Sequence, residues 1–231
     1  MDMNNRTFSI IANHSAKQHL SGLLTSKSNP ESYCAHMVEL GRLLANEFVT
    51  YLDKSATCLI ISTAEDADFL QKGVTSVLHG HNIDTKLAVF WNHHYQLSNK
   101  TSVAPIVHKF IEAGFESTND IVIVKSVMSG SCVVRTNLIE MIEQVKNVNN
   151  IYIVSPVIHS KSEESLSNEF PSTISDKFKF IYFAKDMLKD QTSGEVIPGI
   201  GGEVYNLLGL SKQPVLTSYI PNVVQDLVFG R

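Results

Sequence analysis

The chain has 231 residues, of which 43% are hydrophobic and 18% charged, so it can bury a substantial core and is not a disordered protein. Its net charge of −4, without a run of lysines or arginines, argues against a nucleic-acid surface. No apolar segment approaches the roughly 20 residues of a membrane span, the N-terminus lacks a signal-peptide core, and the 3 cysteines are far apart. We therefore expect a cytoplasmic α/β protein that binds neither nucleic acid nor a membrane.

Apolar residues follow a pattern that alternates strands with helices along the chain. Short β-branched runs predict strands at 8–12, 56–62, 86–91, 120–124, 150–156 and 179–184. Apolar residues at helical spacing predict helices at 15–25, 31–52, 64–77, 103–113, 138–145, 163–169 and 203–209, with Gly114 ending the fourth. This alternation predicts an α/β fold with a mostly parallel sheet flanked by helices.

The stretch that follows the strand at 120–124 has the features of an anion site. Ligands of parallel sheets bind at the carboxyl ends of the strands, and residues 125–132 lie at such an end. Ser129, Gly130 and Ser131 let the backbone approach a phosphate, supply two hydroxyl donors and precede a helix N-terminus. The stretch predicts a phosphate site, with an ordinary strand-to-helix turn as the alternative.

Several side chains at predicted strand ends have two interpretations. Lys125 is either a cation that binds a phosphate or nucleotide directly, or a strand-end lysine that reaches solvent or a neighbouring acid. His93 and His94 are either acid–base or ligand groups at a strand end, or a polar pair without a role. Cys132, near a helix N-terminus, is either a reactive thiol or an inert one.

Other polar residues carry weaker signals. Residues 195–202 form a second glycine-rich loop, whose spacing is neither that of a dinucleotide fingerprint nor that of a P-loop. His79 and His81 lack a third ligand at a recognisable spacing, so no metal site is predicted. Asp66 and Asp68 are interpreted as the acidic first turn of a helix.

Three segments, taken together and in order, resemble the uracil phosphoribosyltransferase family. The family's early H-P-x-x-x-H-K-L and L-L-x-Y-E motifs are similar to residues 14–20 and 43–47. Its central V-D-P-M-L-A-T-G-G-S motif lies over residues 124–133, and its late P-G-L-G-D-A-G-D-R-L-F-G motif aligns without a gap with residues 198–209.

The resemblance implies a type I phosphoribosyltransferase fold and a role in pyrimidine salvage. Members of the family move ribose 5-phosphate from phosphoribosyl pyrophosphate (PRPP) to uracil, with Mg²⁺ on the pyrophosphate. The resemblance implies that the 5-phosphate is held by Ser129, Gly130, Ser131, Cys132 and Val133. It also implies that the base is recognised by the loop of Ile197, Pro198, Gly199, Ile200 and Gly201.

The sequence departs from the family where charge matters. The family's acidic residue before the phosphate loop, which contacts the ribose hydroxyls, is Lys125 here. Its pyrophosphate-binding arginine is Ser62, followed by Glu65 and Asp66. Val133 replaces a serine, Trp91-Asn92-His93-His94 replaces a tyrosine-arginine-acid segment, and Gly202, Tyr205 and Asn206 replace charged residues after the Pro-Gly loop. Since each such contact is typically worth about 2.7–4 kcal/mol in a transition state, little transfer activity is expected.

Residues 211–231 extend beyond the predicted transferase-like domain, 1–210. Their apolar residues form pairs spaced four apart, interrupted by Pro221. Such a stripe must be buried, either on its own domain or against a second subunit or another protein.

We therefore predict a diverged uracil phosphoribosyltransferase-like protein, a homo-oligomer that binds a nucleotide or phosphate-bearing molecule or acts as a scaffold, without normal transfer activity. The alternative is an active transferase or related nucleotide-converting enzyme of changed specificity, using Lys125 and either His93 or His94. Mg²⁺ is expected only if PRPP is still used.

Overall fold

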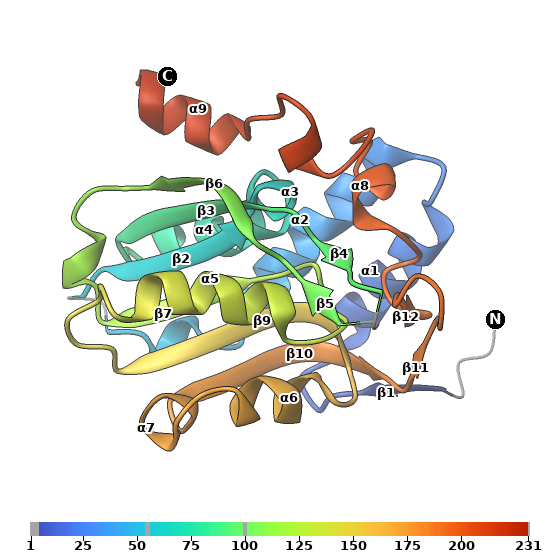
Figure 1. Cartoon of the computed structure of the whole chain (residues 1–231), viewed down its shortest axis with the longest axis horizontal. Helices are drawn as coiled ribbons and strands as arrows, with labels where there is room; N and C mark the ends of the chain where they lie inside the picture. The colour runs from blue at the N-terminus through green and yellow to red at the C-terminus, as the bar shows by residue number, and fades with distance from the viewer. Residues whose placement is uncertain (1–4, 54–55, 99–100, 231) are drawn as a thin grey trace.

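The computed structural model describes residues 5–53, 56–98 and 101–230. Its centre is a sheet in the order β1-β10-β9-β7-β2-β3-β6, with the short β8 paired to β9 (Figure 1). The strands are β1 (Arg6–Phe8), β2 (Cys58–Thr63), β3 (Thr85–Asn92), β6 (Ile106–Ile111), β7 (Asp120–Val124), β8 (Val127–Met128), β9 (Asn150–His159) and β10 (Phe178–Asp186). All pairings are parallel except those of β1 and β6 at the two edges. The predicted α/β fold with a mostly parallel sheet is confirmed.

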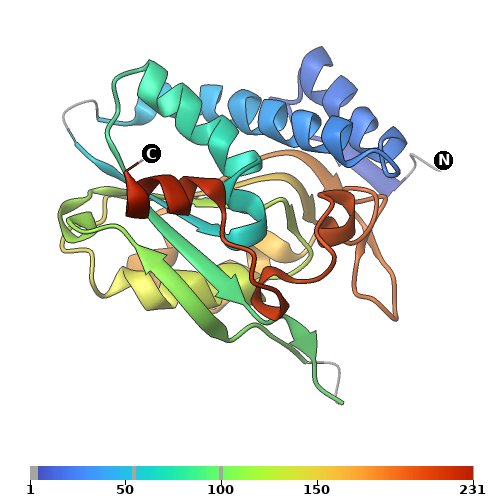
Figure 2. The same cartoon turned by 90° about the horizontal axis from the view of Figure 1, so that it is seen from above.

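Helices cover both faces of the sheet (Figure 2). They are α1 (His14–Thr25), α2 (Pro30–Asn46), α3 (Ala64–Ala67), α4 (Leu70–Gly80), α5 (Cys132–Ile142), α6 (Ser162–Asn168), α7 (Ser172–Ser175), α8 (Val204–Leu207) and α9 (Asn222–Phe229), with single 3-10 turns at Val49–Tyr51, Phe115–Ser117 and Pro214–Leu216. None of the helices in the described residues is both long and apolar enough to cross a membrane.

Two hydrophobic clusters, one on each face, hold the layers together. Successive residues of a strand point to opposite faces, so Ile60 of β2 packs in the cluster with α1, α2 and α4, whereas Ile61 packs with α5 and α6. Gly41 and Gly73 allow α2 and α4 to touch, because a Cβ on Gly41 would lie 2.1 Å from the Leu70 carbonyl oxygen. The sheet is therefore a rigid platform, buried on both faces.

One predicted helix is wrong. Residues 103–113 contain β6, which pairs antiparallel with β3 at the sheet edge. Its apolar residues Ile106, Phe110 and Ile111 are spaced as on a helix, but Phe110 packs in one hydrophobic cluster and Ile106 and Ile111 pack in the other, on the two faces of the sheet. Gly114 does not end a helix. It has a φ of 87° and directly precedes the 3-10 turn at Phe115–Ser117.

Other predicted boundaries move. The helix expected at 31–52 ends at Asn46 and is followed by a 3-10 turn, and the helix at 64–77 is two helices, α3 and α4. The strand expected at 8–12 is β1, which lies earlier, at Arg6–Phe8. The strand expected from residue 56 begins at Cys58, and the helix at 203–209 is reduced to α8.

Two short hairpins and the C-terminal segment border one end of the sheet. The hairpins pair β4 (Tyr95–Gln96) with β5 (Ser102–Val103), and β11 (Leu188–Lys189) with β12 (Val196–Ile197). Both lie near the carboxyl ends of the parallel strands, where α8 also lies (Figure 1). These elements are therefore placed to enclose a site at this end.

Candidate functional site

A cavity of about 650 Å³ lies at the carboxyl ends of β2, β3 and β7. Glu65 comes from α3, directly after β2, His94 from the turn after β3 and Lys125 from the turn after β7. The volume is within the range of small-molecule sites. The edge of the sheet at which ligands were expected therefore holds an actual cavity.

Not all predicted site residues border the cavity. Those that do are Lys125, His94, Ser129, Gly130, Cys132, Val133 and Ile200. Those that are absent from its wall are His93, Ser131, Ile197, Pro198, Gly199 and Gly201. Residues 129–133 thus border the cavity except at Ser131, the Pro-Gly loop borders it through Ile200 and the residues that follow, and phosphate binding stays a prediction.

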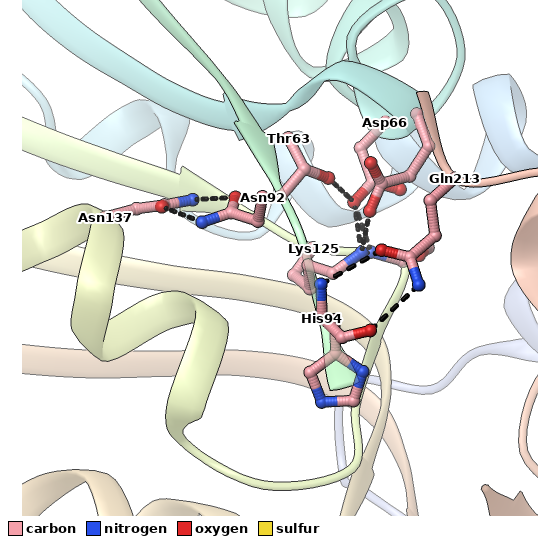
Figure 3. Close-up of polar contacts among 9 residues, drawn as sticks. Thr63, Asp66, Asn92, His94, Lys125, Asn137 and Gln213 are labelled. Carbon is pink, nitrogen blue, oxygen red and sulfur yellow. Dashed lines mark hydrogen bonds and ion pairs between the residues drawn. The ribbon is translucent and has the colours of Figure 1, made fainter. Parts of the chain in front are cut away.

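Lys125 lies in a buried ion-pair network (Figure 3). Its ammonium donates to Asp66 Oδ2 at 2.7 Å, to Glu65 Oε1 at 3.1 Å and to Ser126 Oγ at 3.2 Å. Asp66 Oδ2 also accepts from Thr63 Oγ1 at 2.9 Å. Of the two interpretations of Lys125, the geometry matches the lysine paired with neighbouring acids.

The network has one ammonium for two carboxylates. Burial by itself lowers the pKa of Lys125, but the Asp66 and Glu65 carboxylates outweigh it and hold the pKa above its ordinary value. Lys125 therefore stays charged, and the side chains of Glu65 and Asp66 are only 8% and 2% exposed. Because two carboxyl groups surround this one ammonium, acidic groups are in surplus in this wall, and the lysine charge is not free for a phosphate.

Residues 129–133 have fewer side-chain donors free for a phosphate than the sequence predicts. Ser131 Oγ donates to Glu169 Oε1 at 2.8 Å, so this hydroxyl is engaged outside the cavity wall. Cys132 Sγ contacts the Ser102 carbonyl oxygen at 3.3 Å, and burial raises the pKa of the Cys132 thiol. The inert interpretation of Cys132 therefore fits better, and Ser129 and Gly130 are the parts of the loop that border the cavity.

The turn after β3 is held by the C-terminal segment. The Gln213 amide accepts from the His94 backbone N–H at 2.9 Å and donates to the His94 carbonyl oxygen at 2.8 Å (Figure 3). Burial and then the Lys125 charge lower the pKa of His94, so its ring is neutral at pH 7. Next to it, Asn92 and Asn137 exchange two amide hydrogen bonds of 2.8 and 3.1 Å. His94 is thereby fixed in the cavity wall, while the neighbouring ring of His93 packs against Tyr95, 5.0 Å away between centroids.

The Pro-Gly loop is fastened by a second buried ion pair. Arg6 donates to both Asp186 oxygens at 2.7 Å and to the Gly199 carbonyl oxygen at 2.6 Å, while Asp186 accepts the Gly199 N–H at 2.8 Å. Tyr33 Oη donates to the Ile200 carbonyl oxygen at 2.9 Å. The backbone N–H and C=O of Gly199 are therefore already paired. Base recognition by this loop stays a prediction, and fewer backbone groups are free to contact a base.

Part of the C-terminal extension packs on its own domain. Asp68 accepts from Tyr219 Oη at 3.0 Å and from the backbone N–H groups of Asn222 and Val223 at 2.7 and 3.0 Å, at the start of α9. Trp91 Nε1 donates to the Tyr219 carbonyl oxygen at 2.9 Å. The interpretation of Asp66 and Asp68 as an acidic first helical turn is incomplete, since Asp66 pairs with Lys125 and Asp68 holds the extension.

Sequence reasoning missed Lys189 and Gln213, which both line the cavity. Neither follows a predicted strand: Lys189 is placed by the β11–β12 hairpin and Gln213 by a 3-10 turn. Within the described ranges no group of three or more His, Cys, Asp or Glu side chains could hold a metal. His79 instead contacts Thr85 Oγ1, with its Nε2 at 2.8 Å.

Comparison with known proteins finds a solved structure with a similar fold, but no matching sequence family. No family model matches the chain, and no curated protein matches it. The structure of the AQ2163 protein from Aquifex aeolicus has a TM-score of 0.65 and 13% identity, and covers 90% of this chain and 98% of that one. This likeness shows a shared fold over most of the chain.

Solved phosphoribosyltransferases are also similar, at lower scores. The APRTase from Giardia lamblia complexed with 9-deazaadenine has a TM-score of 0.43 and 11% identity, covering 71% of this chain and 84% of that one. The purine phosphoribosyltransferase from Pyrococcus horikoshii Ot3 has a TM-score of 0.37 and 18% identity, covering 62% and 81%. Scores of this size add no argument about the function of this chain.

Proposed function

We propose that this chain is a phosphoribosyltransferase-like protein that binds a nucleotide or another phosphate-bearing small molecule and lacks ordinary PRPP-dependent transfer to uracil. The ordered motif resemblance and the cavity beside Ser129 and Gly130 support the binding part of the proposal. The volume of about 650 Å³ suits a ligand of nucleotide size.

One observation supports the loss of transfer most directly: the buried network of Lys125, Glu65 and Asp66. The resemblance implies that family members have an acidic residue where this chain has Lys125 and an arginine where it has Ser62. Here the lysine is neutralised by two acids from the segment that should attract pyrophosphate. The surplus of acidic groups in this wall opposes a pyrophosphate group and offers no arginine to bind one.

A product assay tests the loss of transfer. Purified protein with Mg²⁺, PRPP and uracil is expected to form no UMP above the background without protein. A thermal-shift series with UMP, inorganic phosphate and uracil tests binding in parallel, because a ligand that binds only the folded state raises the melting temperature. Sustained UMP formation would overturn the proposed loss of activity, and the absence of any shift would overturn the proposed binding.

An active nucleotide-converting enzyme is the second candidate, favoured by His94. His94 lines the cavity and its backbone is held there by Gln213, and its neutral ring can accept a proton from a bound substrate. This candidate requires turnover of some nucleobase or nucleotide that is lost in His94→Gln. Turnover that survives in His94→Gln would remove the candidate.

A partner at the C-terminal extension remains a further proposal. Leu227, Val228 and Phe229 of α9 are exposed by 46%, 55% and 67%, although Val224 is buried. A homo-oligomer formed through residues 211–231, the segment that we propose as an extension of the domain 1–210, is tested by sedimentation of Leu227→Gln/Val228→Gln. A smaller assembly than wild type is expected; equal masses would contradict this docking role.

A further inference from the structure

Two lysines line the cavity, and they differ in their surroundings. Lys125 is neutralised by Glu65 and Asp66. Lys189, on β11, is partly buried, and no residue in the described part of the chain gives its ammonium a hydrogen bond or an ion pair. Lys189 is therefore the one lysine of the described cavity wall whose charge is available to a ligand.

The Lys189 ammonium faces the phosphate loop. A Cβ built on Gly130 would lie 4.0 Å from Lys189 Nζ, which is the nearest atom that it would meet. Since Gly130 has no side chain, the space in front of its backbone is open up to the ammonium. An anion placed there would touch the loop and the lysine at once.

Two other basic groups, Lys161 and His159, interact electrostatically with Lys189, although neither lines the cavity. Burial and the neighbouring charge of Lys161 lower the pKa of Lys189. Burial, followed by Lys189, also lowers the pKa of His159, while Asp186 acts in the opposite direction. The Lys189 ammonium thus has the like charge of Lys161 near it and no paired carboxylate among the described residues, and a bound anion would offset that repulsion.

The remaining charged residues of the cavity wall are acids. Glu195 and Glu203 line it together with Glu65, and burial and the charge of Glu203 raise the pKa of Glu195. The wall therefore offers one free ammonium against several carboxylates. Such a distribution favours one phosphate group at Lys189 and disfavours a second one elsewhere in the cavity.

We propose that Lys189, together with the backbone at Gly130, binds the phosphate of a phosphomonoester, such as a nucleoside monophosphate, directly and without a divalent metal. A lysine acts on phosphate as a point charge, so no metal bridge is needed. The uncharged part of the ligand then extends toward His94 and Asn92. This assignment rests on the proposed function, that the cavity binds a phosphate-bearing molecule.

Calorimetric titration in EDTA tests the assignment with UMP, UDP and uridine as probes. Wild type is expected to bind UMP more tightly than UDP or uridine. Lys189→Gln is expected to bind UMP roughly tenfold more weakly or worse, since a hydrogen bond to a charged group is typically worth that much. Uridine binding should be the same in both proteins, and Lys189→Arg should restore part of the UMP affinity.

The matched control is Lys179→Gln, because Lys179 is exposed on β10 and does not line the cavity. It should bind UMP as wild type does, and both glutamine variants should melt at the wild-type temperature. If wild type binds UMP but Lys189→Gln binds it within twofold, or if binding requires Mg²⁺ or favours UDP, the assignment of Lys189 is wrong. If wild type binds neither UMP nor inorganic phosphate, the proposed function itself fails, and the assignment with it.

Discussion

Lys125 and Lys189 place the same functional group on the wall of one cavity, and only one of them is neutralised. The Lys125 ammonium is held by two carboxylates at 2.7 and 3.1 Å, whereas Lys189 has no such partner among the described residues. A lysine in a cavity is therefore not evidence of a phosphate site until its partners are known. In this molecule, Lys125 has a structural role in the wall, and Lys189 is free to bind a ligand.

The largest expected effect comes from removing the paired lysine. Lys125→Met leaves Glu65 and Asp66 buried without their cation, and breaking a buried pair in this way costs about 3–5 kcal/mol of unfolding free energy. Lys189→Met should change stability by less than about 0.5 kcal/mol. Urea unfolding of both variants measures the difference in unfolding free energy. Equal stabilities would contradict the claim that only Lys125 is paired with buried acids. The triple variant Lys125→Met/Glu65→Gln/Asp66→Asn should recover much of the loss.

The next largest effect is expected at Asp68, which follows the two network acids and holds the C-terminal segment. Asp68→Ala removes one side-chain and two backbone hydrogen bonds at the start of α9, and losing such a cap costs about 0.5–2 kcal/mol. Limited proteolysis should release the extension faster than in wild type. Asp226→Ala, at an exposed position of α9, is the control; a proteolysis rate equal to that of Asp68→Ala would exclude a specific role for Asp68.

A smaller effect is expected when the surplus acidic group alone is removed. Glu65→Gln leaves Lys125 paired one-to-one with Asp66, so the unfolding free energy should change by less than about 1 kcal/mol, in contrast to Lys125→Met. The same urea experiment measures it. A loss as large as that of Lys125→Met would mean that the second carboxylate is essential to the network.

Gly130→Ala should affect binding but not stability. The added Cβ would meet only Lys189 Nζ, at 4.0 Å, so the unfolding free energy should stay within about 0.5 kcal/mol of wild type. The methyl group would occupy the space between the loop and the ammonium, so UMP affinity should fall. Gly80→Ala, where nothing lies within 4 Å of the added Cβ, is the matched control. Equal UMP affinity in both variants would contradict phosphate binding between Gly130 and Lys189.

The smallest effect is expected from the titration of His94. Burial and the Lys125 charge lower the pKa of His94 below its usual 6.5. Below pH 6.5 the unfolded chain binds a proton that the folded chain does not, so stability should fall as the pH drops from 6.5 to the folded-state pKa. His36 and His159 act in the same direction. The unfolding free energy of His94→Gln, measured across this pH range, should depend less steeply on pH than that of wild type. Superimposable curves would contradict a lowered pKa of His94.

The fold was largely predictable because its strands are short β-branched runs and its main helices have clear periodicity. The helix prediction at residues 103–113 was wrong because the apolar residues of the edge strand β6 recur at helical spacing. A neighbouring acid was one of the expected surroundings of Lys125, but its identity could not be predicted because the sequence does not determine the strand order. The parallel pairing of β2 with β7, with Ser62 opposite Val124, brings Glu65 and Asp66 to Lys125.

The positions of Lys189 and Gln213 could not be predicted either. Both lie on short elements whose direction depends on contacts with distant residues: β11 on its pairing with β12, and Gln213 on the backbone of His94. Local propensity does not determine such contacts. The same limit applies to Ser131, whose hydroxyl is engaged by Glu169, 38 residues further along the chain.

The most direct test of the central claim is the phosphorus NMR spectrum of UMP, titrated with the protein in EDTA and without PRPP. Wild type should shift or broaden the phosphate resonance in a saturable way, Lys179→Gln should do the same, and Lys189→Gln should need a roughly tenfold higher concentration or more for the same effect. A phosphate resonance that is unchanged by wild type would contradict a phosphate-binding cavity in this protein.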